Sequence, residues 1–206
     1  MSPKVVDKNE KRREIALSCH ELIHDKGIRN ITIAQVAKTA GIGKGTVYEY
    51  FENKEDIVFE IINMHIEQHH NAFLETIKDV KNTREKVYHF FKFVLDDSAE
   101  NMKHFNGFKD YLSIMLAEEN EAMSEYNGDC HTFFNEQLKK VIEEGVNSGE
   151  LIPQALEMSN GLLIFEKGLV LLKMTQKDYD TKKECELFID NFFDLIEKKN
   201  KVKGKI

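Results

Sequence analysis

Three residues near the N-terminus have the spacing of a zinc hydrolase site. His20, Glu21 and His24 match the pattern His-Glu-x-x-His. In zinc hydrolases two histidines on one helical face bind the metal and the glutamate acts as the general base. A zinc metallopeptidase is therefore one alternative. The pattern comes without an obvious third ligand, and the neighbouring Leu22 and Ile23 are needed for packing, so we expect a structural helix here instead.

A second histidine pair lies further along the chain. His65 and His69 are four residues apart, with His70 adjacent. On a helix this spacing places two imidazoles on one face, so a metal-sensing regulator is a second alternative. The accompanying thiolate or carboxylate pattern is missing. We expect neither a bound metal nor another cofactor.

The remaining reactive residues do not form a catalytic pattern. Cys19, Cys130 and Cys185 are far apart and form no close pair, so we expect reduced, structural thiols. The sequence contains no glycine-rich phosphate loop, no nucleophile elbow and no paired catalytic carboxylates. We predict that the protein is not an enzyme.

A different pattern, at residues 31–48, favours binding to nucleic acid. It predicts two short helices joined by a turn that contains Gly41, the length of a helix-turn-helix. A small shared core would come from Ile33, Val36, Ala37, Ile42 and Val47. The second helix would then direct Lys44, Gly45, Thr46, Tyr48 and Tyr50 outward. Such a surface suits a major groove, where lysine donates to guanine and a threonine methyl contacts thymine.

The charge distribution agrees with this location. The whole chain of 206 residues has a net charge of −7. Residues 1–54 nevertheless contain ten Lys and Arg against seven Asp and Glu, a charge of +3, which leaves −10 for the remainder. We therefore expect any contact with DNA to lie in the N-terminal quarter.

The elements that would position these residues are all helices. No Gly or Pro occurs between Thr46 and Asn106, and apolar residues there recur every three or four positions. Thr32 and Gln35 have the form of a capping box, and Asn53 offers a second helix cap. We predict an all-α protein with helices near residues 8–26, 33–40, 44–50, 54–80, 83–104, 107–118, 122–148, 154–176 and 182–199.

At the helix-turn-helix the sequence resembles the TetR family of bacterial transcriptional regulators. The matching elements, in order, are Lys26-Gly27, Thr32, Ala40-Gly41, Lys44 to Phe51, and Lys54-Glu55. The resemblance implies an all-helical homodimer. It also implies a DNA-binding domain, which we place at residues 1–53, followed by a ligand-binding and dimerisation domain at residues 54–206.

The resemblance also implies roles for single residues. Thr32, Tyr48, Tyr50 and Lys54 would contact phosphates, and Gly43, Lys44 and Thr46 would lie nearest the bases, with Gly45 on the same outward surface. Hydroxyls, a cation and a helix N-terminus are the usual groups that position a protein on the DNA backbone. Family members often have serine at the position of Gly43, so this chain lacks a capping hydroxyl there.

The C-terminal part would hold the effector and the dimer interface. The apolar segments at about 154–176 and 182–199 must bury more than one face, as two helices from each subunit would in a four-helix bundle. Between the two ends lie many large apolar residues and a few polar ones, a composition that suits a small-molecule site. The residues selected for it are His65, His69, Phe73, Phe91, Phe108, Tyr111, Met115, Phe134 and Gln137.

Together these features predict a cytoplasmic, ligand-responsive regulator. No apolar run reaches the roughly 18 residues of a membrane span, and no signal peptide is evident, so we expect no membrane contact. The expected partners are a near-palindromic double-stranded operator, a small-molecule effector and a second copy of the chain. Repression, relieved by the effector, is the mode that the resemblance implies.

Overall fold

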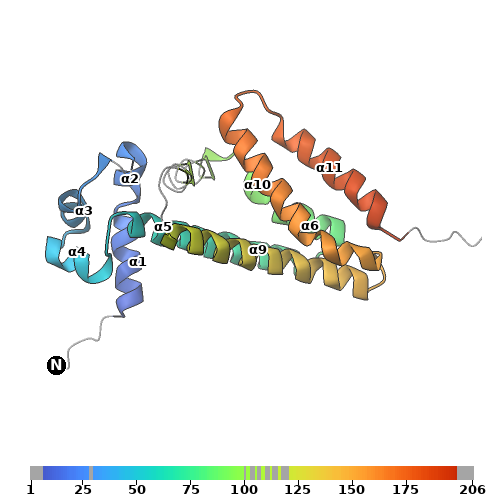
Figure 1. Cartoon of the computed structure of the whole chain (residues 1–206), viewed down its shortest axis with the longest axis horizontal. Helices are drawn as coiled ribbons and strands as arrows, with labels where there is room; N and C mark the ends of the chain where they lie inside the picture. Colours follow the sequence, from blue (N-terminus) through green and yellow to red (C-terminus); the bar gives the residue numbers. More distant parts are fainter. Residues whose placement is uncertain are drawn as a thin grey trace, which may run out of the picture. The chain divides into compact units, whose positions relative to one another are not determined.

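The computed structural model describes residues 7–27, 30–99, 101–102, 105, 108–109, 112, 116 and 121–198 (Figure 1). Over these residues the chain forms helices and no β-strand, which confirms the predicted all-α class. Two compact units are present. One comprises Met1–Asn71 with Asp97–Glu119, and the other comprises Ala72–Asp96 with Asn120–Ile206. The predicted domain boundary after residue 53 stays a prediction.

The first unit contains four short N-terminal helices. They are α1 (Lys8–Ser18), α2 (His20–Lys26), α3 (Ile33–Ala40) and α4 (Lys44–Tyr50). One continuous helix was expected at residues 8–26, but it is divided at Cys19. The Cys19 N–H bonds to Ala16 O, three residues back, at 3.0 Å, so the helix tightens there before α2 begins.

The long helix α5 (Glu55–Ile77) begins in the first unit. The Asn53 side chain accepts a hydrogen bond from the Asp56 N–H at 2.9 Å, as the sequence predicts for a cap. The Asp56 carboxylate in turn accepts from the N–H of Glu52 at 2.9 Å. The start of α5 is thereby fixed, and α5 continues without a break into the second unit.

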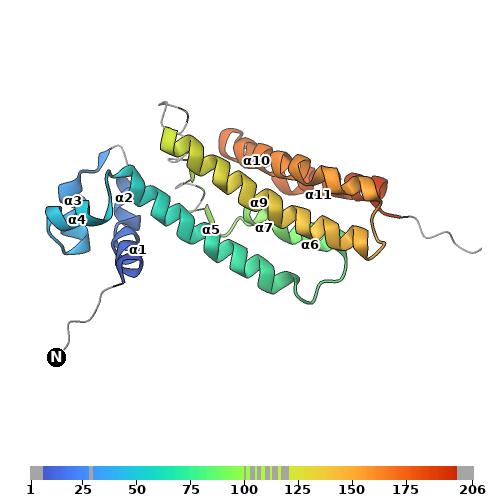
Figure 2. The ribbon, with the colours of Figure 1, turned by 60° about the horizontal axis from the view of Figure 1, so that its bottom comes forward.

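The second unit is a layered group of helices around one apolar core. In chain order its elements after α5 are α6 (Thr83–Phe90), α7 (Lys92–Leu95), α9 (Glu121–Asn147), the 3-10 helix η2 (Pro153–Met158), α10 (Ser159–Thr175) and α11 (Thr181–Ile196). Helix α10 packs against both α9 and α11, as Figure 2 shows. The core of the second unit includes the fully buried Phe91, Leu138, Ile142, Leu162, Leu163, Ile189 and Phe193.

The helix predicted over residues 83–104 ends early. Helix α6 ends at Phe90, and the chain turns at Phe91. Helix α7 then continues to Leu95, and the backbone is extended at Asp96. Lys173 of α10 donates to Val94 O at 2.7 Å and so satisfies a carbonyl at the end of α7. Ser98 then accepts from the Asn101 N–H at 3.2 Å, as a cap of the following turn. The helix predicted near 107–118 falls mostly outside the described residues.

One glycine shows how closely the second unit packs. A Cβ at Gly145 of α9 would lie 2.4 Å from Thr83 Oγ1 and 2.9 Å from Leu151 Cδ1. Only a residue without a side chain lets α6 and the Leu151 segment approach α9 in this way. Within the described residues no helix is long and apolar enough to cross a membrane.

Candidate nucleic-acid interface and effector region

Local hydrogen bonds build the predicted helix-turn-helix from α3 and α4. Thr32 Oγ1 accepts from the Gln35 N–H at 3.3 Å, and Gln35 Oε1 accepts from the Thr32 N–H at 2.9 Å. This confirms the predicted capping box. Helix α3 ends at Ala40; its C-cap Gly41 has a left-handed φ of +66°, and the Ile42 N–H bonds back to Ala37 O at 2.9 Å. The turn therefore depends on glycine at this position.

The turn presents α4 with one face inward and the other outward. Val47 is fully buried, and Phe51 follows it into the core. Tyr48 is 59% exposed, and Lys44 and Gly45 are exposed as well. Most of the predicted small core is present, because Val36, Ala37 and Val47 are buried, whereas Ile33 and Ile42 are half-buried. Thr46 and Tyr50 are half-buried too, so they contribute to packing.

The first turn of α4 carries no side-chain cap. Gly43 is the N-cap residue, and its carbonyl accepts from the Val47 N–H at 3.2 Å. A Cβ at Gly43 would meet only Thr46 Oγ1, at an ordinary 3.8 Å. The backbone would therefore accept the serine that family members often have, and the glycine is not required by local packing.

Arg12 of α1 supports the far end of α4. Its guanidinium lies 4.4 Å above the Phe51 ring, donates from Nε to Glu60 Oε2 at 2.7 Å, and donates from Nη1 to the carbonyl of Tyr50. Arg13 adds hydrogen bonds to Glu67 at 2.6 and 2.7 Å. Helix α4 and the first part of α5 are thus held by the same basic segment of α1.

This support was not predicted from the sequence. The partners Arg12 and Glu60 are 48 positions apart, so local periodicity does not connect them. A signal was present, however. The adjacent Arg12 and Arg13 match a pair of acids, Glu60 and Glu67, which are seven residues apart and so share one face of α5.

Lys54 lies at the edge of the same unit. Its ammonium donates to Ile31 O at 3.4 Å, and the side chain is half-buried. Lys54 therefore ties the start of α5 to the residue before the Thr32 cap. Its predicted contact with phosphate stays a prediction.

The His-Glu-x-x-His segment lies on α2, and its histidines point to different neighbours. The His20 ring packs edge-on against His65 of α5, with centroids 5.6 Å apart. His24 instead groups with Glu21 and Asp25, whose ligand atoms lie within 4.8 Å of one another and are exposed. Among the described residues, no group of three ligands includes both His20 and His24, or includes His69 or His70.

The predicted effector residues are divided between the two units, and their role stays a prediction. His65 and His69 belong to the first unit, as does Phe108, which is half-buried. Tyr111 and Met115 lie outside the described residues. The predicted members in the second unit are Phe73, Phe91, Phe134 and Gln137, of which Gln137 is half-buried on α9.

Aromatic contacts connect the members in the second unit. Phe90, which was not selected from the sequence, joins two of them, because its ring meets Phe73 at 5.7 Å and Phe134 at 6.1 Å between centroids. Phe91 is fully buried and contacts Phe165 of α10 at 5.9 Å. These edge-on and tilted contacts are typical of an aromatic core.

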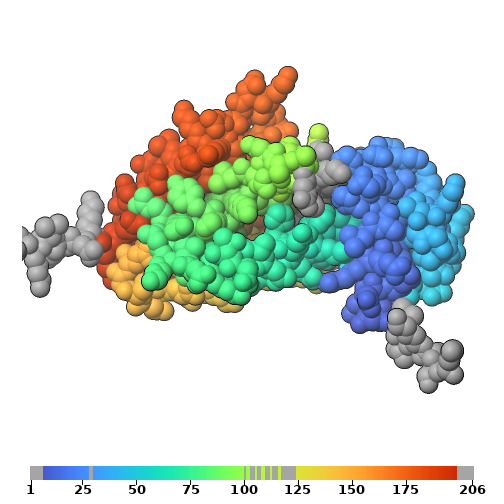
Figure 3. Space-filling model, turned by 180° about the vertical axis from the view of Figure 1, so that it is seen from behind, coloured from blue at the N-terminus to red at the C-terminus, as the bar shows by residue number. Residues whose placement is uncertain are grey.

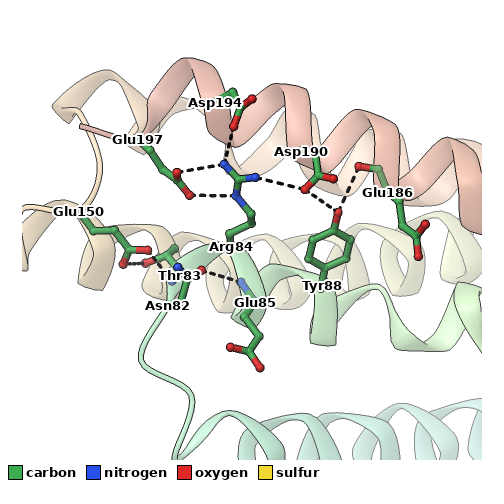
Figure 4. Close-up of polar contacts among 10 residues, drawn as sticks. All are labelled: Asn82, Thr83, Arg84, Glu85, Tyr88, Glu150, Glu186, Asp190, Asp194 and Glu197. Carbon is green, nitrogen blue, oxygen red and sulfur yellow. Dashed lines mark hydrogen bonds and ion pairs between the residues drawn. The ribbon is translucent and has the colours of Figure 1, made fainter. Parts of the chain in front are cut away.

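A polar network fastens α6 to the end of α11. Arg84 of α6 pairs with Glu197 at 2.9 Å, Asp194 at 2.7 Å and Asp190 at 3.2 Å (Figure 4). The Tyr88 hydroxyl lies 3.0 Å from Asp190 Oδ1. Burial, followed by this hydrogen bond, raises the pKa of Tyr88.

The same network continues to the loop after α9. The Thr83 hydroxyl donates to Glu150 Oε2 at 2.6 Å, and the N–H of Thr83 donates to Glu150 Oε1 at 2.9 Å. Figure 3 shows α6 residues (green) against α11 (red) on one face of the molecule. These contacts fix α6 within the second unit.

Comparisons with known proteins agree with this geometry. The family model of bacterial regulatory proteins of the tetR family matches residues 19–61. An HTH-type transcriptional regulator of Staphylococcus aureus is 33% identical over 90 residues, which cover 44% of this chain and 46% of that protein. The chain thus matches a little under half the length of the curated relatives.

Solved structures extend the similarity to the whole fold. A TetR-family transcriptional regulator from Cytophaga hutchinsonii superposes with a TM-score of 0.75 at 17% identity and covers 96% of this chain and 100% of its own. A transcriptional regulator from Saccharomonospora viridis, solved in complex with choline, has a TM-score of 0.69 at 18% identity, over 92% of this chain and 99% of its own. Members of the family are typically DNA-binding regulators without enzymatic activity. Residues 19–61 are thus similar to bacterial regulatory proteins of the tetR family, and the helical architecture is similar to that of the solved regulators.

Proposed function

We propose that the protein is a DNA-binding transcriptional regulator that responds to a small molecule. The observation that carries this proposal is the geometry of α3 and α4. A capped helix, a left-handed glycine and a buried Val47 together direct the exposed Lys44, Gly45 and Tyr48 away from the core. This is the arrangement by which a recognition helix enters a major groove.

Within this surface the residues have separate roles. Lys44 and Thr46, with the backbone at Gly43 and Gly45, would lie nearest the bases. Thr32, Tyr48, Tyr50 and Lys54 would contact phosphates and set the position of α4 on the duplex. Because Thr32 also caps α3, its hydroxyl would serve both the fold and the DNA.

A homodimer would supply the second recognition helix. Four large apolar side chains of α10 and α11 are more than half exposed, namely Ile164, Leu171, Leu187 and Leu195. A second copy of the same two helices would bury them in a four-helix bundle. The operator would then be a near-palindrome with half-sites about one DNA turn or somewhat more apart.

Helix α5 provides a route from the effector to the DNA. Its first part and its middle are tied to α1 by the Arg12–Glu60 and Arg13–Glu67 contacts, and its last part carries Phe73, which contacts Phe90 in the second unit. We propose that the effector favours a dimer in which α5 has moved, so that the recognition helices no longer fit successive grooves and repression ends. A neutral or cationic small molecule would bind in the helical second unit; the S. viridis regulator is a precedent for a small cation as ligand, since it was solved in complex with choline.

Selection of bound fragments from genomic DNA, followed by a salt series, tests the proposal. We expect a near-palindrome that binds about a thousandfold or more tightly than bulk DNA. Lys54→Ala should weaken binding to every sequence and reduce the salt slope by about one. Lys44→Ala should relax specificity at one position in each half-site, by about tenfold to a hundredfold.

Lys78→Ala is the matched control, because Lys78 is exposed and pairs only locally with Glu75 among the contacts shown. It should bind like the parent. If Lys44→Ala and Lys54→Ala also bind like the parent, the assigned surface is wrong.

Sedimentation tests the dimer separately. Leu171→Glu should shift the protein toward monomer, because a charge would replace an apolar group in the bundle. Leu74→Glu on α5, at a leucine that is also exposed, should leave the dimer intact. Equal behaviour of the two variants would contradict the proposed interface.

A further inference from the structure

The inward side of α10 contains a carboxylate among apolar side chains. Glu166 is three residues from Leu163 and Leu169 and four from Leu162 and Val170, and all four are buried. Residues three and four apart lie on the same helical face. Glu166 therefore faces the interior of the second unit. Its side chain is half-buried, so part of it stays accessible from solvent.

No cation of the described chain neutralises this group. Neither an ion pair nor a hydrogen bond joins the Glu166 carboxylate to another described residue. The adjacent Lys167 is exposed, and its ammonium lies 3.2 Å from His131 Nδ1 of α9. Lys173, two turns further along α10, donates to Val94 O.

The groups around Glu166 determine the pKa of its carboxyl. Burial raises the pKa of the Glu166 carboxyl from 4.5 to about 7, and the charge of Lys167 opposes this change. On α11 the nearby Cys185 is fully buried, and its pKa is raised by burial and by the charges of Glu186 and Glu166. Across α9, the titratable neighbours of Lys167 include His131 and Cys130; burial raises the pKa of the Cys130 thiol, and the charge of Lys167 opposes this change. A raised pKa is what we expect of a buried carboxyl that has no positive partner.

A second polar atom, on the neighbouring helix α9, also lacks a hydrogen-bond partner among the described residues. Asn135 Oδ1 of α9 is buried and has no hydrogen-bond donor among the described residues. Asn135 is one turn from His131, which contacts Asn160 at 2.9 Å and Lys167 at 3.2 Å, so it lies on the side of α9 that faces α10. Buried acceptors are normally satisfied, and one that is not requires an explanation.

Aromatic rings complete these surroundings. Phe165, the neighbour of Glu166, stacks on Phe188 with centroids 3.8 Å apart, and Phe188 stacks on Phe192 at 5.9 Å. Ring faces attract organic cations, and burial strengthens the attraction. Helices α9, α10 and α11 thus offer a negative group, an acceptor and ring faces, and no cation of the described residues forms an ion pair with the Glu166 carboxylate.

We propose that the effector is an organic cation, an alkylammonium or quaternary ammonium compound, that binds the Glu166 carboxylate between α9, α10 and α11. An N–H or O–H of the ligand would donate to Asn135, and the rings around Phe165 would contact its apolar part. The inference rests on the proposed function, because it names the class of small molecule to which the regulator responds.

Direct binding to the full-length protein, without DNA, tests this inference. The probes are cations paired with neutral compounds of the same shape: choline with neohexyl alcohol, hexylammonium with hexanol, and benzyltrimethylammonium with neopentylbenzene. We expect at least one cation to raise the melting temperature and to bind in calorimetry at least about tenfold more tightly than its neutral partner. If no cation of the panel is preferred over its partner, the proposal is overturned.

A conservative variant assigns any preference to Glu166. Glu166→Gln keeps the shape and removes the charge, so the preference for the cation should fall by about tenfold or more. Glu157→Gln, at an exposed glutamate of η2, is the control and should retain it. A cation preference that survives in Glu166→Gln would place the ligand elsewhere and overturn the proposal.

Proton release gives a second readout. A cation favours the ionised carboxylate, so binding at about pH 6 should release part of a proton in the parent and less in Glu166→Gln. Because no DNA is present, this result is independent of operator binding. A cation that binds but leaves an operator complex intact would contradict the proposed regulation and leave the cation site standing.

Discussion

In the helix-turn-helix, polar side chains such as Lys44 and Tyr48 point to solvent, whereas α10 directs the carboxylate of Glu166 toward buried leucines. An exposed polar group keeps its hydration and costs the fold little. An inward one loses hydration, and the fold must tolerate that cost. An unpaired polar group should therefore lower the stability of the protein alone at Glu166, but not at the exposed Lys44 and Tyr48.

Glycines differ between the two regions in the same way. At Gly45 of α4 an added Cβ would meet no atom within 4 Å, whereas at Gly145 of α9 it would collide with Thr83 and Leu151. The space beside Gly45 lets another molecule approach the backbone. The space beside Gly145 is already occupied by Thr83 and Leu151 of the protein itself.

The largest expected effect is the pH dependence that Glu166 confers. The folded protein binds this proton more tightly than the unfolded chain, because burial raises the pKa from 4.5 to about 7. Protonated Glu166 therefore contributes to stability at pH values below the pKa of the unfolded state. This contribution, about 3 kcal/mol in total, is lost as the pH rises through the pKa of the folded state. Urea unfolding of the parent and Glu166→Gln, from about pH 4 to about pH 8, should show the two stabilities diverging as pH rises, with the variant the more stable at neutral pH. Parallel curves would mean that the carboxylate is well solvated.

Next in size is the effect of adding a side chain at Gly145. Gly145→Ala should lower the free energy of unfolding by about 1–3 kcal/mol, since Thr83 and Leu151 must move. Gly128→Ala, on the same helix with no atom near the added Cβ, should instead be neutral or stabilising. Chemical denaturation of both variants checks the difference. An equal response would show that α6 and the Leu151 segment adjust freely.

A smaller effect is expected at the cap of α3. Thr32→Ala removes the acceptor for the Gln35 N–H and should destabilise the protein by about 1 kcal/mol. Thr39→Ala, within α3 at an exposed position, should stay within about 0.5 kcal/mol of the parent. Thermal and urea unfolding of the pair separates the role of the cap from that of a threonine in general.

The smallest effect on stability is expected at Gly45, where an added Cβ meets no atom. Gly45→Ala should raise the free energy of unfolding by about 0.5–1 kcal/mol, because alanine favours the helix and no atom lies near the new Cβ. The same change should weaken binding to the selected operator, since the methyl group would stand between α4 and the DNA. Unchanged operator affinity in this more stable variant would move the proposed contact away from Gly45.

The parts of the fold that depend on neighbouring residues were predictable from the sequence. The capping box of Thr32 and Gln35 and the Asn53 cap are present as expected. Each depends on groups within four positions, and their residue types indicate the geometry directly. The DNA-contact roles of the surrounding residues remain predictions.

The parts that depend on distant residues were not predictable. The end of α7 depends on Lys173, 79 positions from Val94, and so the continuous helix expected over residues 83–104 was wrong. Glu166 stands out in the sequence only as an interruption of an apolar run. Since α10 is apolar on most sides, the sequence did not show whether this residue faces inward or outward.

The joined ends of two segments in the second unit have a mechanical consequence. Leu151 and Glu197 form an isolated bridge, the Ile152 N–H bonds to Ile196 O at 2.9 Å, and the Lys198 N–H bonds to Glu150 O at 2.8 Å. With the Arg84 contacts, they clamp one end of α11, while its other end follows the turn after α10. The 16 residues of α11 extend about 24 Å from this clamp. The rest of α11 is held as well, because Thr181, Cys185 and Ile189 are buried, so the helix cannot swing about this end without breaking its packing on α10.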